Sequence, residues 1–190
     1  MLDLQQKGCH NISLVTPTHY TPQIMKALPI AIENGLSLPI VYNTSGYDSL
    51  ETIKLLEGIV DIYMPDIKFL NSQLSKQYCH AENYPEIVTE VVKEAQRQTG
   101  DLIIDENGVA KKGLVIRHLL MPSCEEDTKM ILRFICNEIS KNAFVNIMAQ
   151  YHPCHRADEF KNISHRISMK EHMDVIRYAE DLGLTRALNH

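Results

Sequence analysis

The sequence predicts an α/β fold in which parallel strands form a partial (β/α) barrel of the TIM-like kind. Short apolar runs recur along the chain, at residues 12–15, 38–41, 59–64, 114–116 and 144–148. Each run precedes a helical pattern, which is typical of parallel strands buried on both faces. Each run also ends in polar, chemically useful residues, and reactive groups gather at the carboxyl ends of the strands in such folds.

Helix signals fill the segments between these runs. We expect helix starts or capping boxes at Thr21, Asp48, Ser123 and Ser168. We expect the first two of these helices to end at Gly35 and Gly58, and a further helix, with an apolar face over residues 87–95, to end at Gly100. Pro29 lies inside the first of these helices and is expected to kink it.

Three further segments complete the order of elements. Residues 71–85 are polar and suggest a loop with a short helix, and residues 154–167 suggest a polar loop. Residues 102–110 predict a small hairpin with a type I′ turn at Asn107-Gly108, inserted beside the barrel. The order is β-α-β-α-β-α, the hairpin, then β-α-β-α. Residues 1–190 are expected to form a single domain. Since five strands do not close an eight-stranded barrel, either its sheet is an open, partial barrel or the chain is missing something.

Composition narrows the class of protein. The net charge of the 190 residues is −5 and no basic stripe appears, which argues against a nucleic-acid partner. No apolar stretch has the length of a membrane span, and residues 1–7 lack the apolar region of a signal peptide. The five cysteines are odd in number and widely spaced, so we expect free thiols in a reducing cytoplasm.

The strand ends offer a set of candidate site residues. They are His19, Asp66, Lys68, Arg117, His118 and His152. Imidazoles and a carboxylate on one face can bind a divalent metal for hydrolysis, which would use His19, Asp66, His118 and His152. The same face can instead bind an anionic or zwitterionic small molecule. Single histidines at strand ends are also often hydrogen-bonded structural residues.

Two motifs are more specific. Strand alternation puts the side chains of Asp66 and Lys68 on the same side, as a structural ion pair or as a ligand contact. Residues 42–47 supply Asn, Thr, Ser and Gly in a tight turn, which either presents polar groups to a ligand or is an ordinary βα turn.

Longer phrases resemble the radical S-adenosylmethionine activating enzymes, and in particular the homologues of pyruvate formate-lyase-activating enzyme. Residues 61–68, DIYMPDIK, resemble the segment of their fourth strand, and residues 42–46 are similar to their third-strand Thr-Asn-Gly turn. Residues 117–122 and 151–153 resemble their fifth and sixth strand ends. The phrases at residues 10–19, HNISLVTPTH, and 148–153, MAQYHP, are shared with that branch.

This resemblance implies a six-stranded partial barrel, S-adenosylmethionine and a [4Fe–4S] cluster. In the family, reduction of S-adenosylmethionine gives a 5′-deoxyadenosyl radical that abstracts hydrogen from a glycine of a glycyl-radical enzyme, with flavodoxin or ferredoxin as electron donor. By resemblance, the residues that would line the S-adenosylmethionine and substrate end are Thr16, Thr18, His19, Asn43, Thr44, Asp66, Lys68, Arg117, His118, Gln150 and His152. Thr16 and Thr18 stand where many relatives have Gly-Gly-Glu.

The sequence also departs from the family pattern. The cluster motif C-x-x-x-C-x-x-C is absent, and Cys9 lies too late to replace it. By comparison the chain begins within the first helix, so we expect a shortened or degenerate relative without cluster or radical activity. The non-enzyme alternative is a remnant that holds S-adenosylmethionine or a partner. Without a neighbour, strand 11–17 becomes an exposed edge, and we expect self-association through it.

Overall fold

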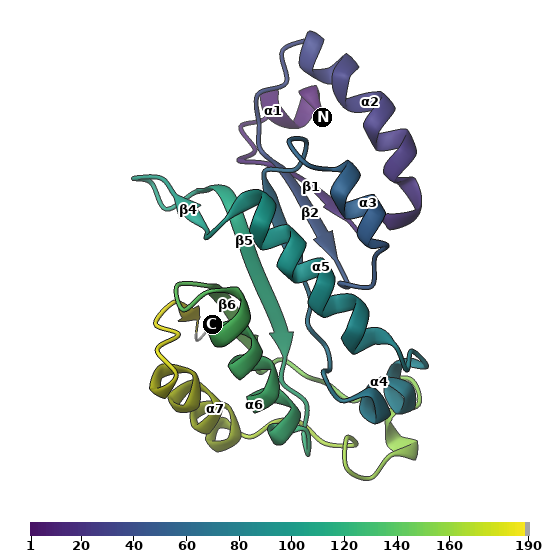
Figure 1. Cartoon of the computed structure of the whole chain (residues 1–190), viewed down its shortest axis with the longest axis vertical. Helices are drawn as coiled ribbons and strands as arrows, with labels where there is room; N and C mark the ends of the chain where they lie inside the picture. The colour runs from purple at the N-terminus through teal and green to yellow at the C-terminus, as the bar shows by residue number, and fades with distance from the viewer. Residues whose placement is uncertain (189–190) are drawn as a thin grey trace.

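A computed structural model describes residues 1–188 as one sheet with helices packed along it (Figure 1). The strands are β1 (Ile12–Val15), β2 (Ile40–Thr44), β3 (Ile62–Pro65), β4 (Ile103–Ile104), β5 (Ala110–Leu119), β6 (Phe144–Met148) and β7 (Ala187–Leu188). The sheet has the order β1-β2-β3-β5-β6-β7, with every neighbouring pair parallel, and β4 pairs antiparallel with β5.

This arrangement confirms the predicted α/β partial barrel. The strand order is an open path that does not return from β7 to β1 within residues 1–188. All five predicted strands are present. The sixth parallel strand, β7, was not predicted because its two residues are too few to give a periodic pattern.

Helix α1 (Leu2–Gln6) precedes β1, and the other helices lie in the crossovers between parallel strands. These are α2 (Thr21–Glu33), α3 (Leu50–Leu55), α4 (Ser72–Cys79), α5 (Tyr84–Thr99), α6 (Glu125–Phe134) and α7 (Met169–Asp181). Short 3-10 turns occur at Thr18–Tyr20 and Ala157–Glu159, and a π-helical turn at Ile135–Ile139 extends α6. As predicted, Gly100 follows α5 and the 71–85 segment holds a short helix, α4.

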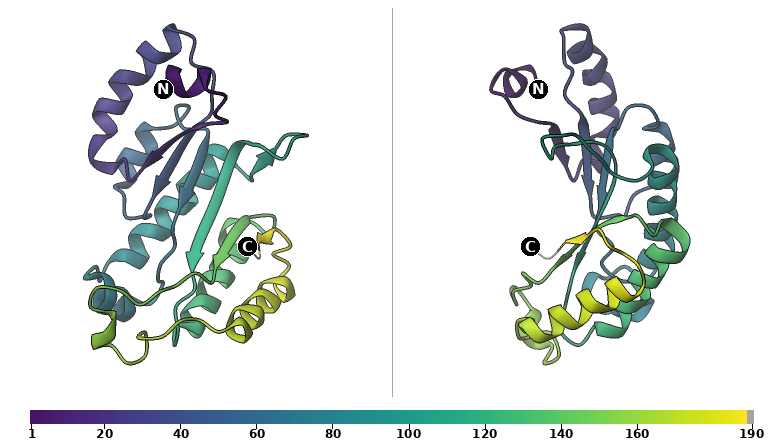
Figure 2. Two further views of the ribbon diagram at one scale, coloured as in Figure 1. Left: turned by 180° about the vertical axis from the view of Figure 1, so that it is seen from behind. Right: turned by 90° about the vertical axis from the view of Figure 1, so that its left-hand side faces the viewer.

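The main hydrophobic core lies between the sheet and its helices. Val88 and Val92 of α5 and Ile131 of α6 are fully buried against strand residues such as Tyr42 and Tyr63. Burying each large aliphatic side chain stabilises the fold by about 1.5–3 kcal/mol. The side view in Figure 2 shows this helix layer on one side of the sheet and leaves the other side open. We call these two sides the helix-covered face and the open face.

One of the predicted helix starts is confirmed and one is wrong. Ser168 and Glu171 form a capping box at the start of α7, as expected. Thr21, in contrast, is the first residue of α2, and Tyr20 takes the N-cap position. The Thr21 hydroxyl donates to the carbonyl oxygens of Pro17 and Thr18 instead, at 3.3 and 3.2 Å.

The other two predicted capping boxes are not formed. The helix α3 opens at Asp48-Ser49 as predicted, but Ser49, and not Asp48, is its cap and accepts from the backbone N–H of Thr52 at 3.4 Å. Cys124 holds the N-cap position of α6 without a side-chain bond, while Ser123 adopts a left-handed backbone with φ of 59°. In both cases the real cap lies one residue after the predicted one, a shift that sequence patterns do not resolve.

The predicted hairpin exists but differs in two respects. A type I′ turn needs positive φ at both central residues, and here Gly108 has φ of 78° while Asn107 does not. The Asp105 carboxylate holds the loop by accepting from the N–H groups of Asn107 and Val109, both at 2.9 Å. The second arm also continues into the barrel strand β5, so the hairpin is an extension of that strand and not a separate insertion.

The predicted edge strand is β1. Within residues 1–188 it pairs only with β2, and Val15 at its end is 70% exposed. Self-association through this edge stays a prediction. None of the helices in the same range combines the length and apolarity needed to cross a bilayer.

Candidate functional site

Strand alternation divides the polar residues at the strand ends between the two faces of the sheet. Asn43 and Arg117 project to the open face, whereas their immediate neighbours Thr44 and His118 are buried on the helix-covered face. This division decides which sequence-predicted residues can meet a ligand.

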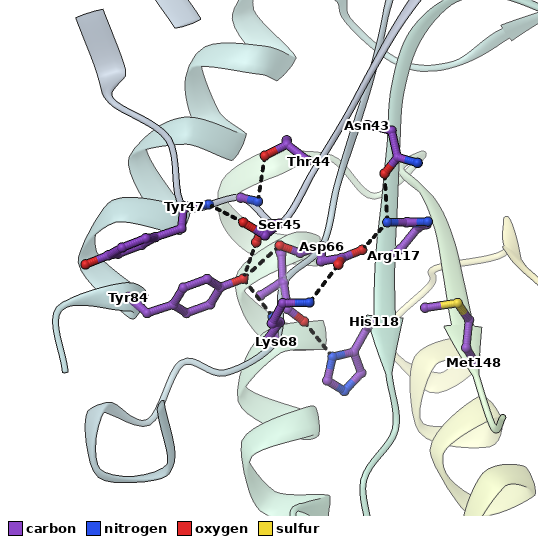
Figure 3. A network of polar contacts seen from close by, with 12 residues as sticks. Asn43, Thr44, Ser45, Tyr47, Asp66, Lys68, Tyr84, Arg117, His118 and Met148 are labelled. Atoms are coloured by element: carbon purple, nitrogen blue, oxygen red, sulfur yellow. Dashed lines mark hydrogen bonds and ion pairs between the residues drawn. The ribbon is translucent and has the colours of Figure 1, made fainter. Parts of the chain in front are cut away.

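Three of the predicted residues form an ion network on the open face (Figure 3). Asp66 Oδ2 lies 2.7 Å from Lys68 Nζ, and Asp66 Oδ1 lies 2.6 Å from Arg117 Nη2. Arg117 Nη2 also donates to Asn43 Oδ1 at 2.8 Å. The prediction that Asp66 and Lys68 point to the same side is therefore confirmed. The network joins the ends of β2, β3 and β5.

The open face also holds buried polar atoms that lack a hydrogen-bond partner among residues 1–188. They are Asp66 Oδ1, Arg117 Nε and Asn146 Oδ1. Asp66 Oδ1 is nevertheless satisfied by its ion pair with Arg117, which leaves Arg117 Nε and Asn146 Oδ1 as the atoms without a partner. Asn146 of β6 pairs in register with Arg117 of β5, so these atoms lie on adjacent strands. Since an unsatisfied buried polar atom costs about 1–3 kcal/mol, this strip suits a ligand that supplies the missing partners.

Apolar side chains flank the polar strip. In the β1-β2-β3 register, Val15 and Met64 are the two neighbours of Asn43, and Met148 follows Asn146 at the next open-face position of β6. Met64 packs against the small open-face cluster of Val41 and Ile62. The face therefore combines hydrogen-bonding groups with apolar and thioether surface.

Tyr84 of α5 holds the backbone around the ion network in place. Its hydroxyl oxygen lies 2.8 Å from the Ser45 carbonyl and 2.9 Å from the Asp66 carbonyl, and it accepts from the Lys68 N–H at 3.0 Å. Burial raises the pKa of Tyr84, so its hydroxyl stays protonated and can donate. Tyr47 stacks on this ring with a centroid distance of 5.8 Å. One buried hydroxyl thus holds the loops after β2 and β3 together.

Gly46 allows this close approach. Its φ is +77°, and a Cβ here would lie 2.6 Å from the Asp66 carbonyl oxygen and 2.7 Å from Val88 Cγ2. The Gly46 N–H donates to the Thr44 hydroxyl at 3.1 Å. The turn at residues 42–47 is thus used within the protein, apart from Asn43, whose side chain reaches the open face.

His118 does not belong to the open-face site, contrary to the expectation. It is 2% exposed, its Nδ1 lies 2.7 Å from the Ile67 carbonyl oxygen, and its Nε2 lies 2.9 Å from Thr128 Oγ1 on α6. Burial lowers the pKa of His118, although the hydrogen bond to Ile67 opposes this shift. His118 is a neutral residue that ties β5 to α6. The expectation failed because Arg117 and His118 are adjacent on one strand.

Asp48 is a central residue that sequence reasoning assigned to a helix cap. It is 3% exposed and accepts from Thr18 Oγ1 at 2.6 Å, from Tyr42 Oη at 3.1 Å, and from the Thr44 hydroxyl. The hydroxyls of Thr18 and Thr44, both expected to contact a ligand, therefore donate to the Asp48 carboxylate. Burial and, next, the Asp48 charge raise the pKa of Tyr42 to about 12. Several hydroxyl side chains close to Asp48 in the sequence, such as those of Tyr42 and Thr44, could have indicated this role.

The remaining predicted residues lie around the network and outside it. Thr16 has φ of 51° and donates its backbone N–H to the Asn43 carbonyl at 2.8 Å. His19 is exposed beside Tyr20, and Gln150 is exposed after β6. His152 is exposed and accepts from Arg166 Nε at 3.2 Å.

The predicted hydrolase site is not assembled. Within residues 1–188 no group of three or more His, Cys, Asp or Glu side chains is arranged to hold a metal ion. His118 is buried on the helix-covered face, while His19 and His152 are exposed elsewhere, so they do not join Asp66 in one ligand set.

Comparisons with known proteins support the fold. No protein-family model matches the sequence. Over 169 residues the chain is 32% identical to an uncharacterized protein of Methanocaldococcus jannaschii, MJ0674; the match covers 88% of this chain and 45% of that protein. The chain thus spans about half the length of this relative. The structure is similar to a crystal structure of a domain of pyruvate-formate lyase-activating enzyme from Bacteroides vulgatus, with a TM-score of 0.68 and 14% identity over 95% of this chain and 98% of that domain.

Proposed function

We propose that the open face binds S-adenosylmethionine, in a protein related to the radical S-adenosylmethionine activating enzymes of glycyl-radical enzymes. Two findings support the proposal. The fold is similar to that of a domain of such an activating enzyme. The single observation that carries it is the strip on the open face where Arg117 Nε and Asn146 Oδ1 are buried without a hydrogen-bond partner among residues 1–188, beside the Asp66 carboxylate and the side chain of Met64.

The chemistry of the strip suits a nucleoside joined to an amino acid. Asp66 carries one negative charge, and Lys68 and Arg117 carry two positive charges beside it. The excess of one cation favours a carboxylate, such as that of the methionine moiety. The carboxylate of Asp66 and the amide of Asn146 can accept from ribose hydroxyls. Met64 and Met148 offer polarizable surface to an adenine ring.

The cluster that the family uses does not fit these residues. When bound, a [4Fe–4S] cluster supplies the electron for cleaving S-adenosylmethionine and is held by cysteine thiolates. The 190 residues contain no C-x-x-x-C-x-x-C, and no such cysteine group exists in the described part of the chain. We therefore derive ligand binding from this chain and no radical step. A glycyl-radical enzyme as partner and a flavodoxin or ferredoxin as electron donor remain proposals about the whole protein.

Isothermal titration of S-adenosylmethionine into this chain tests the proposal. We expect weak binding by the unmodified chain. Asp66→Asn and Arg117→Gln should each weaken it about 10- to 100-fold, because each removes a charged hydrogen-bonding group from a partly buried site. Glu126→Gln is the matched control, since it removes a charge from an exposed pair with Lys129 on α6.

Urea unfolding of the same variants separates binding from folding. The midpoints of Asp66→Asn and Arg117→Gln should stay close to that of the unmodified chain. No detectable binding by the unmodified chain, or equal affinity in the unmodified chain and both variants, would refute the assignment.

A further inference from the structure

A separate cavity of about 370 Å³ adjoins the network at the carboxyl ends of the strands. Lys68 and Phe69 after β3 form one side of it, and residues 77–80 at the end of α4 form another. Residues 154–157, Phe160 and Ile163 close it from the segment after β6. Figure 2 shows this segment crossing beneath the strand ends to reach α4. The volume is within the range of about 300–1,000 Å³ that is typical of small-molecule sites.

Aromatic rings form a continuous wall of the cavity. Tyr78 lies between Phe69 and Phe160, with centroid distances of 5.9 and 5.4 Å, and it meets Phe160 edge-on at 88°. Asn162 donates to the Tyr78 hydroxyl at 2.7 Å and thereby fixes that ring. Leu119 and Met121 add apolar surface. Aromatic pairs favour edge-to-face and offset arrangements, so such a wall suits a flat aromatic guest.

Within residues 1–188 the lining of the cavity carries no carboxylate. Its ionisable residues are Lys68, His80, His155 and Arg156, together with Tyr78 and two thiols, and the acidic partners of its two cations, Asp66 and Glu159, lie outside the lining. Asp66 orients Lys68 from one side, and Glu159 holds the Arg156 guanidinium through two contacts of 2.8 Å. Lys68 and the exposed Arg156 each keep N–H donors that these contacts do not use.

The Cys79 thiol adds no negative charge to the lining. Burial raises the pKa of Cys79, against the opposing effect of Lys68, so this thiol is neutral near pH 7. His80 and His155 both have φ of 55°, a left-handed backbone that is uncommon for residues other than glycine. These two histidines directly follow Cys79 and Cys154, so the backbone is held in an unusual conformation at two positions of the cavity lining.

We propose that this cavity is a binding site for a small planar aromatic carboxylate, distinct from the S-adenosylmethionine site. The aromatic body would lie against Tyr78 and Phe160, and the carboxylate would face Arg156 and the imidazoles. This assignment uses none of the buried polar atoms on the open face and stands independently of the proposed function.

A matched set of probes tests the proposal on the unmodified chain. We would titrate 2-naphthoate, 2-naphthylmethanol and 2-naphthylmethylamine and follow backbone amide signals by NMR. We expect 2-naphthoate to shift the signals of Tyr78, Ala157 and Phe160. The carboxylate should bind about tenfold more tightly than the alcohol, as for a hydrogen bond to a charged group, and the amine should bind most weakly.

Variants locate the site. Phe160→Ala and Arg156→Gln should each weaken 2-naphthoate binding about tenfold. Arg177→Gln is the control, because Arg177 forms a comparable exposed i,i+3 pair with Asp174 on α7. Arg117→Gln should leave naphthoate affinity unchanged, which distinguishes this test from the one for S-adenosylmethionine. Equal affinity for the three probes, preference for the amine, shifts confined to other regions or no shifts at millimolar concentration would overturn the proposal.

Discussion

The two faces of the sheet use polar side chains for opposite purposes. On the helix-covered face, Asp48 and His118 are almost fully buried, and every nitrogen or oxygen that their side chains present has a partner. On the open face, Arg117 Nε and Asn146 Oδ1 are buried without a partner among residues 1–188. The comparison indicates that polar groups on the covered face stabilise the fold, whereas those on the open face are arranged for a ligand.

Replacing Asp48 and Asp66 in turn tests this difference between the faces, and the Asp48 variant should show the largest loss of stability. Asp48→Ala leaves the hydroxyls of Thr18, Tyr42 and Thr44 without their acceptor and should lower the free energy of unfolding by about 3–5 kcal/mol. Asp66→Ala should lower it by less than about 1 kcal/mol, because Lys68 and Arg117 remain partly exposed to water.

Urea unfolding at neutral pH measures both values. Asp48→Asn keeps one acceptor oxygen and should fall between the unmodified chain and Asp48→Ala. Similar losses for the Asp48 and Asp66 variants would mean that the two faces do not differ in the way described.

Replacing Gly46 should give the next largest loss of stability, because this residue packs closely against the Asp66 carbonyl and Val88 of α5. Gly46→Ala forces a Cβ into the Asp66 carbonyl and Val88 and should cost about 2–4 kcal/mol of stability. Gly58 has the same φ of +77° and nothing within 4 Å of its Cβ position, so Gly58→Ala should cost about 1 kcal/mol from backbone strain alone. Thermal unfolding of the pair isolates the steric part, and equal costs would contradict the close approach at Gly46.

His118 should contribute a smaller part of the stability, and that part depends on pH. Burial lowers its pKa in the folded state below the ordinary value of about 6.5, so in that range the unfolded chain binds more protons than the folded chain. The stability that His118 contributes is therefore present above that value and is lost as the pH falls below it. The slope is at most about 1.4 kcal/mol per pH unit for one proton.

Urea unfolding between neutral and mildly acidic pH checks this sign. His118→Gln should remove the part of the slope that comes from this residue. His172→Gln is a useful comparison, since His172 is also buried and lies 3.2 Å from the Ile147 carbonyl oxygen. An unchanged slope in His118→Gln would show that His118 is not the buried neutral group described here.

Sequence reasoning predicted the architecture better than the site. Apolar runs as clear as residues 144–148 correspond to β6 without any shift, because strand burial leaves a periodic signal. The short β7 leaves no such signal. The caps predicted at Thr21, Asp48 and Ser123 each lie one residue from the N-cap of the structure. The N-caps of α2 and α6, Tyr20 and Cys124, make no side-chain hydrogen bond, so no capping side chain marks them in the sequence.

For the site, the sequence predicted which strand ends carry the polar residues, but not on which face of the sheet each side chain lies. Asn43, Asp66, Lys68 and Arg117 were expected to converge, and they do. Thr44 and His118 were expected with them, although alternation along a strand sends neighbours to opposite sides. The roles of Asp48 and Tyr84 depend on contacts between distant segments, which local patterns do not encode.

Ligand binding on the open face can be tested by following side-chain signals on both faces during one NMR titration with S-adenosylmethionine. We expect shifts in the side-chain amides of Asn43 and Asn146 and in the Nε–H of Arg117, with the ring signals of His118 unchanged. Shifts in the His118 ring without shifts in these open-face groups would contradict this expectation.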